Sequence, residues 1–232
     1  MGRILQVVSL VIGLMSNLLP LVGVLYWQWD TFQLLMLFWM ETTIAAFWML
    51  MRLSRLSPAE CGTFTVNGQK KQATPRALVL FFALHSGGFI LVHLFFVFVM
   101  FSVEWLKNIH SAGDFLYGLF VARGVWIALI AMFISYGISF FVAPRPPARG
   151  AAGNDDQADP VGEIVMPLYV RIFIMQAAII FGAWDSGRAG SIAPLIIVIV
   201  LKTLIDLGAG LRTATRNKIG FSVSTNKISI ET

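Results

Sequence analysis

The sequence predicts an all-α membrane protein, a bundle of six transmembrane helices with both ends of the chain in the cytoplasm. Three observations predict this class. Of the 232 residues, 57% are hydrophobic and only 12% are charged, whereas soluble domains carry about 25% charged residues. The apolar residues form continuous runs, and the basic residues gather at the ends of these runs. A soluble enzyme, a disordered chain and a disulfide-rich secreted domain are thereby excluded.

Six apolar segments are long enough to form helices that cross about 30 Å of hydrocarbon. They run from Ile4 to Trp27, Phe32 to Leu53, Ala77 to Val103, Phe115 to Val142, Ile164 to Trp184 and Gly190 to Leu211. We therefore expect one transmembrane domain over residues 1–212, with polar loops at 54–75 and 143–163 and a polar tail at 213–232.

The distribution of Lys and Arg predicts the orientation, because these residues favour the cytoplasmic side of a membrane. Of the 17 basic residues, twelve lie at the N-terminus or in and directly beside the loops 54–75 and 143–163 and the tail, and two lie in loops on the opposite side. We expect a multi-pass membrane protein with cytoplasmic termini. The net charge of +5 follows from this orientation, so we expect no nucleic-acid partner. The expected partners are the lipid bilayer and a second copy or another membrane protein.

The loop 54–75 contains two local signals. Asn67-Gly68 is a frequent two-residue hairpin turn, although an irregular loop fits the residues equally well. The single cysteine, Cys61, excludes an intrachain disulfide and a metal site built from several cysteines.

Seven ionisable residues lie inside the predicted spans, where a charged group is costly and is therefore a candidate for a functional site. They are Glu41, His85, His93, Arg123, Arg171, Lys202 and Asp206. A helical rise of about 1.5 Å per residue places Glu41, His93 and Arg123 about 12–15 Å from the outer ends of three spans. We expect these three to line a polar site in the outer half of the membrane.

The other four ionisable residues lie about 8–13 Å from the inner ends of their spans. Lys202 and Asp206 are four residues apart on one helix and can pair directly, and Arg171 can share Asp206 from the neighbouring helix. Both groups also fit a purely structural interpretation, in which oppositely charged residues neutralise one another and hold the helices together.

His85 and His93 are the candidate ligands for a metal or a haem iron. They are eight residues apart, which separates them by about 80° around the helix and about 12 Å along it, so they cannot bind the same ion. The alternative is a neutral histidine bonded to a backbone carbonyl or to Glu41. The sequence has no phosphate loop, dinucleotide fingerprint or zinc-protease motif, and we expect no cofactor.

Three groups of residues carry a resemblance to a known family. They are Asn17-Leu-Leu-Pro20 followed by Trp39-Met-Glu41, then His85-Ser-Gly-Gly-Phe-Ile-Leu-Val-His93, then Arg171-Ile with Leu201-Lys-Thr-Leu-Ile-Asp206. In these the chain resembles the uncharacterised bacterial integral-membrane family catalogued as domain of unknown function 6498. The resemblance implies a multi-spanning bundle in a bacterial inner membrane and supports the choice of candidate residues, but it implies no activity. It also implies that relatives carry a histidine at the position of Met175, which weakens a ligand or proton role there in this chain.

Three functions fit these residues. The leading hypothesis is a transporter of a small solute, an ion or protons, with Glu41, His93 and Arg123 lining its site. The second is a redox protein or enzyme that binds a metal or haem through His85 or His93. The third is a structural or assembly protein in which every buried charge joins two helices. The first and third are not enzymes, and we favour them over the second.

Overall fold

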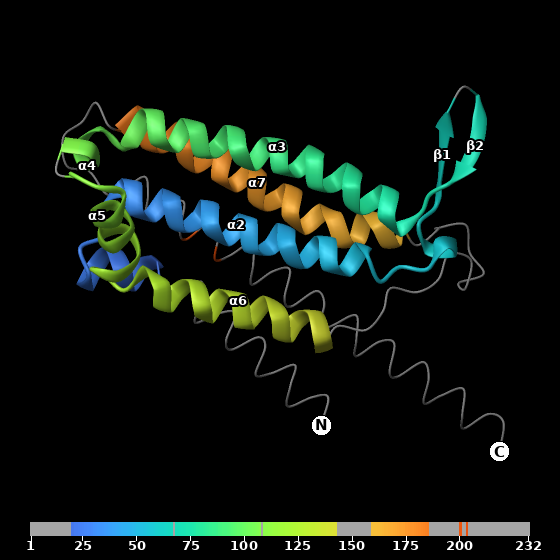
Figure 1. Cartoon of the computed structure of the whole chain (residues 1–232), viewed down its shortest axis with the longest axis horizontal. Coiled ribbons are helices and arrows are strands. Elements are labelled where there is room, and N and C mark those ends of the chain that lie inside the picture. Colours follow the sequence, from blue (N-terminus) through green and yellow to red (C-terminus); the bar gives the residue numbers. More distant parts are fainter. Residues whose placement is uncertain are drawn as a thin grey trace, which may run out of the picture.

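Four long helices lie side by side in the computed structural model, which describes residues 20–66, 68–107, 109–142 and 159–185 together with residues 200 and 203. These helices are α2 (Thr31–Leu53), α3 (Pro75–Phe101), α6 (Val125–Val142) and α7 (Pro160–Asp185), as Figure 1 shows. One end of the bundle carries α4 (Val103–Lys107), α5 (Ala112–Leu116) and a π-helical turn (Tyr117–Val121). The other end carries a 3-10 turn (Pro58–Glu60) and a hairpin of β1 (Thr63–Val66) and β2 (Gln69–Gln72). We call these the Arg123 end and the hairpin end.

The long helices have the length and the composition of membrane spans. Among the described residues, three helices are long and apolar enough to cross a membrane, and the bent pair Ala112–Val121 and Val125–Phe141 makes up to four. Large apolar side chains cover their outer surfaces, including Leu84, which is 70% exposed, and Phe173, which is 74% exposed. Because soluble monomers rarely expose large continuous apolar surfaces, this surface indicates a membrane protein. The predicted spans Ile4–Trp27 and Gly190–Leu211 lie mostly outside the described residues.

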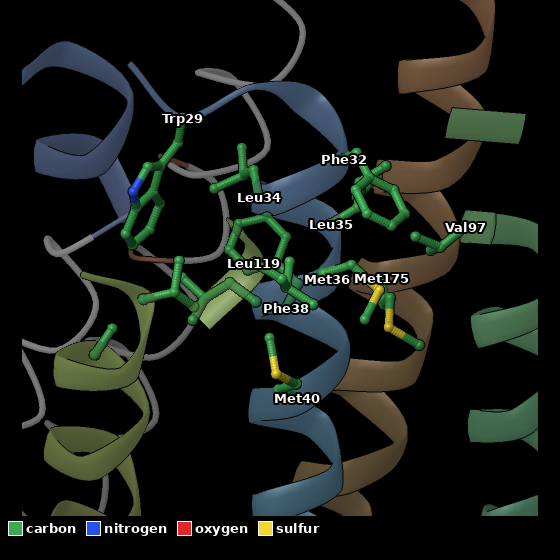
Figure 2. Packing of buried hydrophobic residues seen from close by; sticks show 14 of the residues in the cluster. Trp29, Phe32, Leu34, Leu35, Met36, Phe38, Met40, Val97, Leu119 and Met175 are labelled. Carbon is green, nitrogen blue, oxygen red and sulfur yellow. The ribbon is translucent and has the colours of Figure 1, made fainter. Parts of the chain in front are cut away.

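Helix α2 is the central helix of the described bundle, because it packs against α3, α6 and α7. Its first turn is fixed by Asp30, whose side chain accepts a hydrogen bond from the Gln33 backbone N–H in a capping box. Figure 2 shows side chains of α2 meeting Val97 of α3 and Met175 of α7 in a buried apolar cluster. A residue in the middle of α2 can therefore reach three neighbouring helices.

The predicted span from Phe115 to Val142 is broken, because the chain bends by 65° between the π-helical turn and α6. The break covers residues 122–124, where Gly124 has a φ of +71°. This left-handed conformation suits glycine and interrupts a right-handed helix. The Trp29 indole N–H donates to the Arg123 carbonyl oxygen at 3.0 Å, which satisfies a backbone acceptor that the break leaves open.

Helix α7 begins at Pro160, inside the predicted loop 143–163. Proline suits the first position of a helix, because it needs no hydrogen-bond acceptor for a backbone N–H and its φ is already helical. The sequence predicts a start at Ile164, because the charged Glu163 borders a segment rich in Pro and Gly. The structure places Glu163 in the first turn of α7, where a carboxylate favours the helix dipole.

The predicted hairpin at Asn67-Gly68 is confirmed. Strands β1 and β2 pair antiparallel, from Thr63 opposite Gln72 to Val66 opposite Gln69, and Gly68 has a φ of +76°. The base of the hairpin is closed by the Ala73 backbone N–H, which donates to the Gly62 carbonyl oxygen at 2.9 Å.

Three residues that flank the hairpin fasten its base to the helices. Leu56, Cys61 and Ala73 are buried in one apolar cluster with Met49 and Leu53 from the last turns of α2. The base of the hairpin is thus part of the core at this end of the bundle.

The thiol of Cys61 provides a test of this packing. Burial first, and the neighbouring Glu60 carboxylate second, raise the pKa of the Cys61 thiol. Since the thiolate is the reactive form, alkylation of the native protein by iodoacetamide will be slow at neutral pH and will accelerate only above the ordinary pKa of a cysteine. Denaturation will accelerate it at any one pH, and Glu60→Gln will shift the rate profile to lower pH. Equal alkylation rates in native and denatured protein at neutral pH would contradict the buried placement.

Two glycines offer a matched test of the packing near the break. A Cβ added to Gly23 would lie 2.2 Å from the Trp29 ring, whereas a Cβ added to Gly87 would meet nothing within 4 Å. We expect Gly23→Ala to destabilise the protein by about 1–3 kcal/mol, as other overpacked sites do, because the Trp29 ring must shift. Gly87→Ala will leave the stability unchanged or slightly raised. Thermal unfolding in detergent, followed by size-exclusion chromatography, measures both; equal midpoints for the two variants would refute the packing at Gly23.

Candidate functional site: a buried carboxylate between three helices

The carboxylate of Glu41 is the meeting point of α2, α6 and α7. Its Oε1 accepts a hydrogen bond from the Arg171 guanidinium at 2.7 Å and one from the Tyr136 hydroxyl at 3.2 Å. The Glu41 side chain is 4% exposed and that of Arg171 is 17% exposed. The guanidinium also lies over the Tyr136 ring, 5.2 Å from its centroid, within the range of a cation–π interaction. We call Glu41, Tyr136 and Arg171 the Glu41 group.

Each member of the Glu41 group comes from a different long helix. Glu41 lies ten residues after the start of α2, about 15 Å along the helix, and therefore well inside the span. Removing a carboxylate from water costs several kcal/mol, which a close ion pair with further hydrogen bonds offsets. The group therefore combines opposite charges, a hydroxyl donor and an aromatic face around one carboxylate.

Arg171 pairs with Glu41, although the sequence predicted Asp206 as its partner. The helical rise places the Arg171 backbone about 10 Å from the inner end of its span, nearer to the inner face than Glu41. The long arginine side chain bridges that difference, as it does when it reaches along apolar surface in other proteins. Lys202 and Asp206 lie outside the described residues.

Arg123 does not join Glu41, which corrects the expected grouping of Glu41, His93 and Arg123. Its guanidinium donates to the Gln28 carbonyl oxygen at 2.9 Å and to Gln33 Oε1 at 2.5 Å. Because Glu41 lies two helical turns beyond Gln33, the two charged groups are separated by about 12 Å along α2. The physical reason is the break at residues 122–124, which places Arg123 at the end of α6 and not within a straight helix.

The residues around Arg123 close that end of the bundle. Arg123 also lies 3.5 Å from the Asp30 carboxylate, and both side chains are about 40% exposed. Asp30 in turn accepts a hydrogen bond from the Trp105 indole at 2.7 Å and caps α2. An exposed ion pair of this kind contributes little by itself. The hydrogen bonds therefore join α2, α4 and the break into one polar cluster, which we call the Arg123 group.

The two histidines of α3 point to different surroundings. His93 is buried, and its Nδ1 lies 2.6 Å from the Phe89 carbonyl oxygen. Because a carbonyl oxygen only accepts, Nδ1 carries a proton and donates it to this bond. Nε2 is buried and has no hydrogen-bond partner among the described residues. The expected bond from a histidine to a backbone carbonyl is thus present at His93.

His85 is exposed, and its ring stacks on Phe81 with 5.4 Å between the centroids. One imidazole is therefore buried and the other is on the surface, so they do not converge on one ion. In the described part of the chain, no three His, Cys, Asp or Glu side chains lie close enough together to hold a metal ion.

A comparison with protein families identifies the chain. Residues 3–219 match the family described as "Family of unknown function (DUF6498)", so the match covers most of the 232 residues. The chain belongs to the DUF6498 family. No curated protein and no solved structure matches it. The resemblance carried by the short motifs is thereby confirmed.

The DUF6498 chain has a methionine at one position that the resemblance singled out. Met175 of α7 is 2% exposed, and its sulfur accepts a weak hydrogen bond from the Thr42 hydroxyl at 4.0 Å. In this member of DUF6498, Met175 is a packing residue between α7 and α2, as Figure 2 shows.

Sequence reasoning missed four residues of the two polar groups: Tyr136, Asp30, Gln33 and Trp105. Tyr136 is uncharged and lies in an apolar run, so the surrounding sequence gives no sign that the Tyr136 hydroxyl binds a carboxylate. Asp30 and Gln33 have a local signal, because an aspartate three residues before a glutamine at the start of an apolar run is a capping box. In this DUF6498 protein the signal marks both the start of α2 and the partners of Arg123.

Replacement of Arg123 tests whether the Arg123 group stabilises its end of the bundle. Arg123→Met removes the charged donor to Gln28 and to the buried Gln33 Oε1, which keeps only the longer bond of 3.4 Å from the Asp30 backbone N–H. Loss of a hydrogen bond from a charged donor costs about 1–3 kcal/mol. We expect a lower unfolding midpoint in detergent. The matched control is Lys107→Gln, since the Lys107–Glu104 pair is exposed at 61% and 80% and such pairs contribute about 0–1 kcal/mol. An Arg123→Met midpoint as high as that of Lys107→Gln would contradict this role.

Proposed function

We propose that the protein is a multi-pass protein of the bacterial inner membrane that moves protons or another small ion, with the Glu41 group as its intramembrane site. The observation that supports the proposal is the Glu41–Arg171 pair, 2.7 Å long and enclosed by three membrane-type helices. Ionisable groups are rare in hydrocarbon and mark ion and proton pathways in membrane proteins.

The chemistry of the pair explains how it can respond to a proton or an anion. Protonation of Glu41 removes its negative charge and therefore its attraction for Arg171. An anion that binds Arg171 competes with Glu41 in the same way. Arg171 is the more exposed partner, so its guanidinium is the group that can turn toward the membrane surface. In our proposal, breaking and restoring this pair is the step that couples α7 to α2.

The proposed orientation places the hairpin end in the cytoplasm. The twelve-to-two distribution of basic residues supports cytoplasmic termini and a domain of six spans over residues 1–212. In this orientation Glu41 lies near the middle of the membrane, and the Arg171 side chain extends toward Glu41 from the cytoplasmic half.

Proton flux into liposomes that contain the purified protein tests this function. With a pH-sensitive dye inside the vesicles, we expect Glu41→Gln to decrease the flux by about tenfold or more, because an amide cannot exchange a proton at neutral pH. Arg171→Gln will decrease it as well. The control is Glu104→Gln, which changes an exposed carboxylate at the Arg123 end and will leave the flux unchanged. Equal flux for wild type and Glu41→Gln, at equal amounts of reconstituted protein, would refute the proposal.

A structural role is the second candidate, and one observation favours it. A single oxygen of Glu41 binds α6 through Tyr136 and α7 through Arg171, as a residue that locks three helices together would. Removing one partner of a buried pair costs about 3–5 kcal/mol, whereas replacing both by apolar residues is often neutral. If the lock is the whole function, wild type will show no flux, each single variant will fold poorly, and Glu41→Leu with Arg171→Met will restore folded protein.

A further inference from the structure

The β1–β2 hairpin is an arm with a fixed base. Figure 1 shows it leaving the bundle across the direction of the long helices. Strands of four residues give it a length of about 13 Å. At the base, the Gln72 side-chain amide donates to the Pro58 carbonyl oxygen at 2.5 Å, and Cys61 and Ala73 are buried against the end of α2. The direction of the arm is therefore set by the fold.

The arm lies at the level where lipid headgroups would be. Strand β2 ends at Gln72, and α3 begins three residues later at Pro75. The 27 residues of α3 extend about 40 Å, which exceeds the hydrocarbon thickness of about 30 Å. The first turn of α3 therefore emerges into the headgroup layer, and an arm that runs across the helix direction stays within that layer.

The arm and the first turn of α3 carry positive charge. Lys70 and Lys71 of β2 and Arg76 in the first turn of α3 are exposed, and residues 68–76 contain no acidic residue. The nearest acidic residue before the arm, Glu60, accepts hydrogen bonds from the Ser57 backbone N–H and hydroxyl at 2.6 and 2.7 Å. Two more acidic residues, Asp159 and Glu163, lie at the start of α7 and not on the arm.

We propose that Lys70, Lys71 and Arg76 bind the headgroups of anionic phospholipids in the leaflet at the hairpin end. The charges are complementary, and the arm presents them along the membrane plane beside α3. Each Lys or Arg near an anionic membrane surface increases the affinity of a protein for that surface about fivefold. This interaction is separate from ion movement at Glu41, so it can hold whether or not the protein conducts protons.

A fluorescent label on the arm tests the proposal in the full-length protein. The label is attached at Gln69→Cys in a Cys61→Ser background, and the protein is placed in phosphatidylcholine nanodiscs that contain the same small fraction of nitroxide-labelled lipid, either phosphatidylglycerol or phosphatidylcholine. We expect at least about twofold more quenching by the labelled phosphatidylglycerol than by the labelled phosphatidylcholine, because the basic residues concentrate the anionic lipid beside the arm, and we expect high salt to remove the difference. The double substitution Lys70→Gln and Lys71→Gln will bring the quenching down to the phosphatidylcholine value.

Two controls separate lipid binding from its alternatives. Lys107→Gln removes a lysine at the opposite end of the bundle and will leave the quenching unchanged. Inorganic phosphate at constant ionic strength will also leave it unchanged, because the proposed partner is the headgroup in a membrane. Equal quenching in the two kinds of nanodisc overturns the proposal. So does a loss of quenching with free phosphate that matches the lysine substitutions, since it would indicate a site for soluble anions.

Discussion

The contact between the Glu41 carboxylate and the Arg171 guanidinium is the interaction on which the arrangement of the long helices depends. An isolated charge within hydrocarbon is costly, so each of these two residues requires the other. Because Glu41 lies on the central helix and Arg171 on α7, that requirement keeps the Arg171 face of α7 turned toward α2 and within reach of the arginine side chain. Tyr136 extends the same constraint to α6. Apolar packing on either side of this polar contact then sets the exact register of the helices.

The elements of the fold follow largely from local patterns in the sequence. The apolar runs give α2, α3 and α7 nearly the predicted limits, because a helix that meets lipid must stay apolar over its whole length. The hairpin at Asn67-Gly68 follows from turn chemistry in the same direct way. The bend before α6 was not predicted, because the run from Phe115 to Val142 stays apolar through it and Arg123 reads equally well as a buried functional charge.

The depth of residues along their helices predicts only part of the candidate site. Depth along a helix identified Glu41 and Arg171 as residues that need partners, but it did not pair them, because a long side chain reaches over more than a helical turn. Counting depth along one continuous helix grouped Arg123 with Glu41, because the break before α6 was not predicted. Partners such as Tyr136 and Gln33 are uncharged, so only the packing of the helices reveals them. The sequence thus identifies the ionisable residues whose burial is unfavourable, while the three-dimensional contacts show which of them pair.

The break near Arg123 has a consequence for the lipids around the protein. Helix α6 has 18 residues and α3 has 27, which correspond to heights of about 27 and 40 Å. The two helices lie on different sides of α2 (Figure 1), and both carry exposed apolar side chains. A bilayer of uniform thickness cannot match both sides, so either the bundle tilts or the adjacent lipid layer thins beside α6. The difference in helix length therefore appears in one of two ways, as a tilt of the bundle or as a lipid layer that is thinner beside α6 than beside α3.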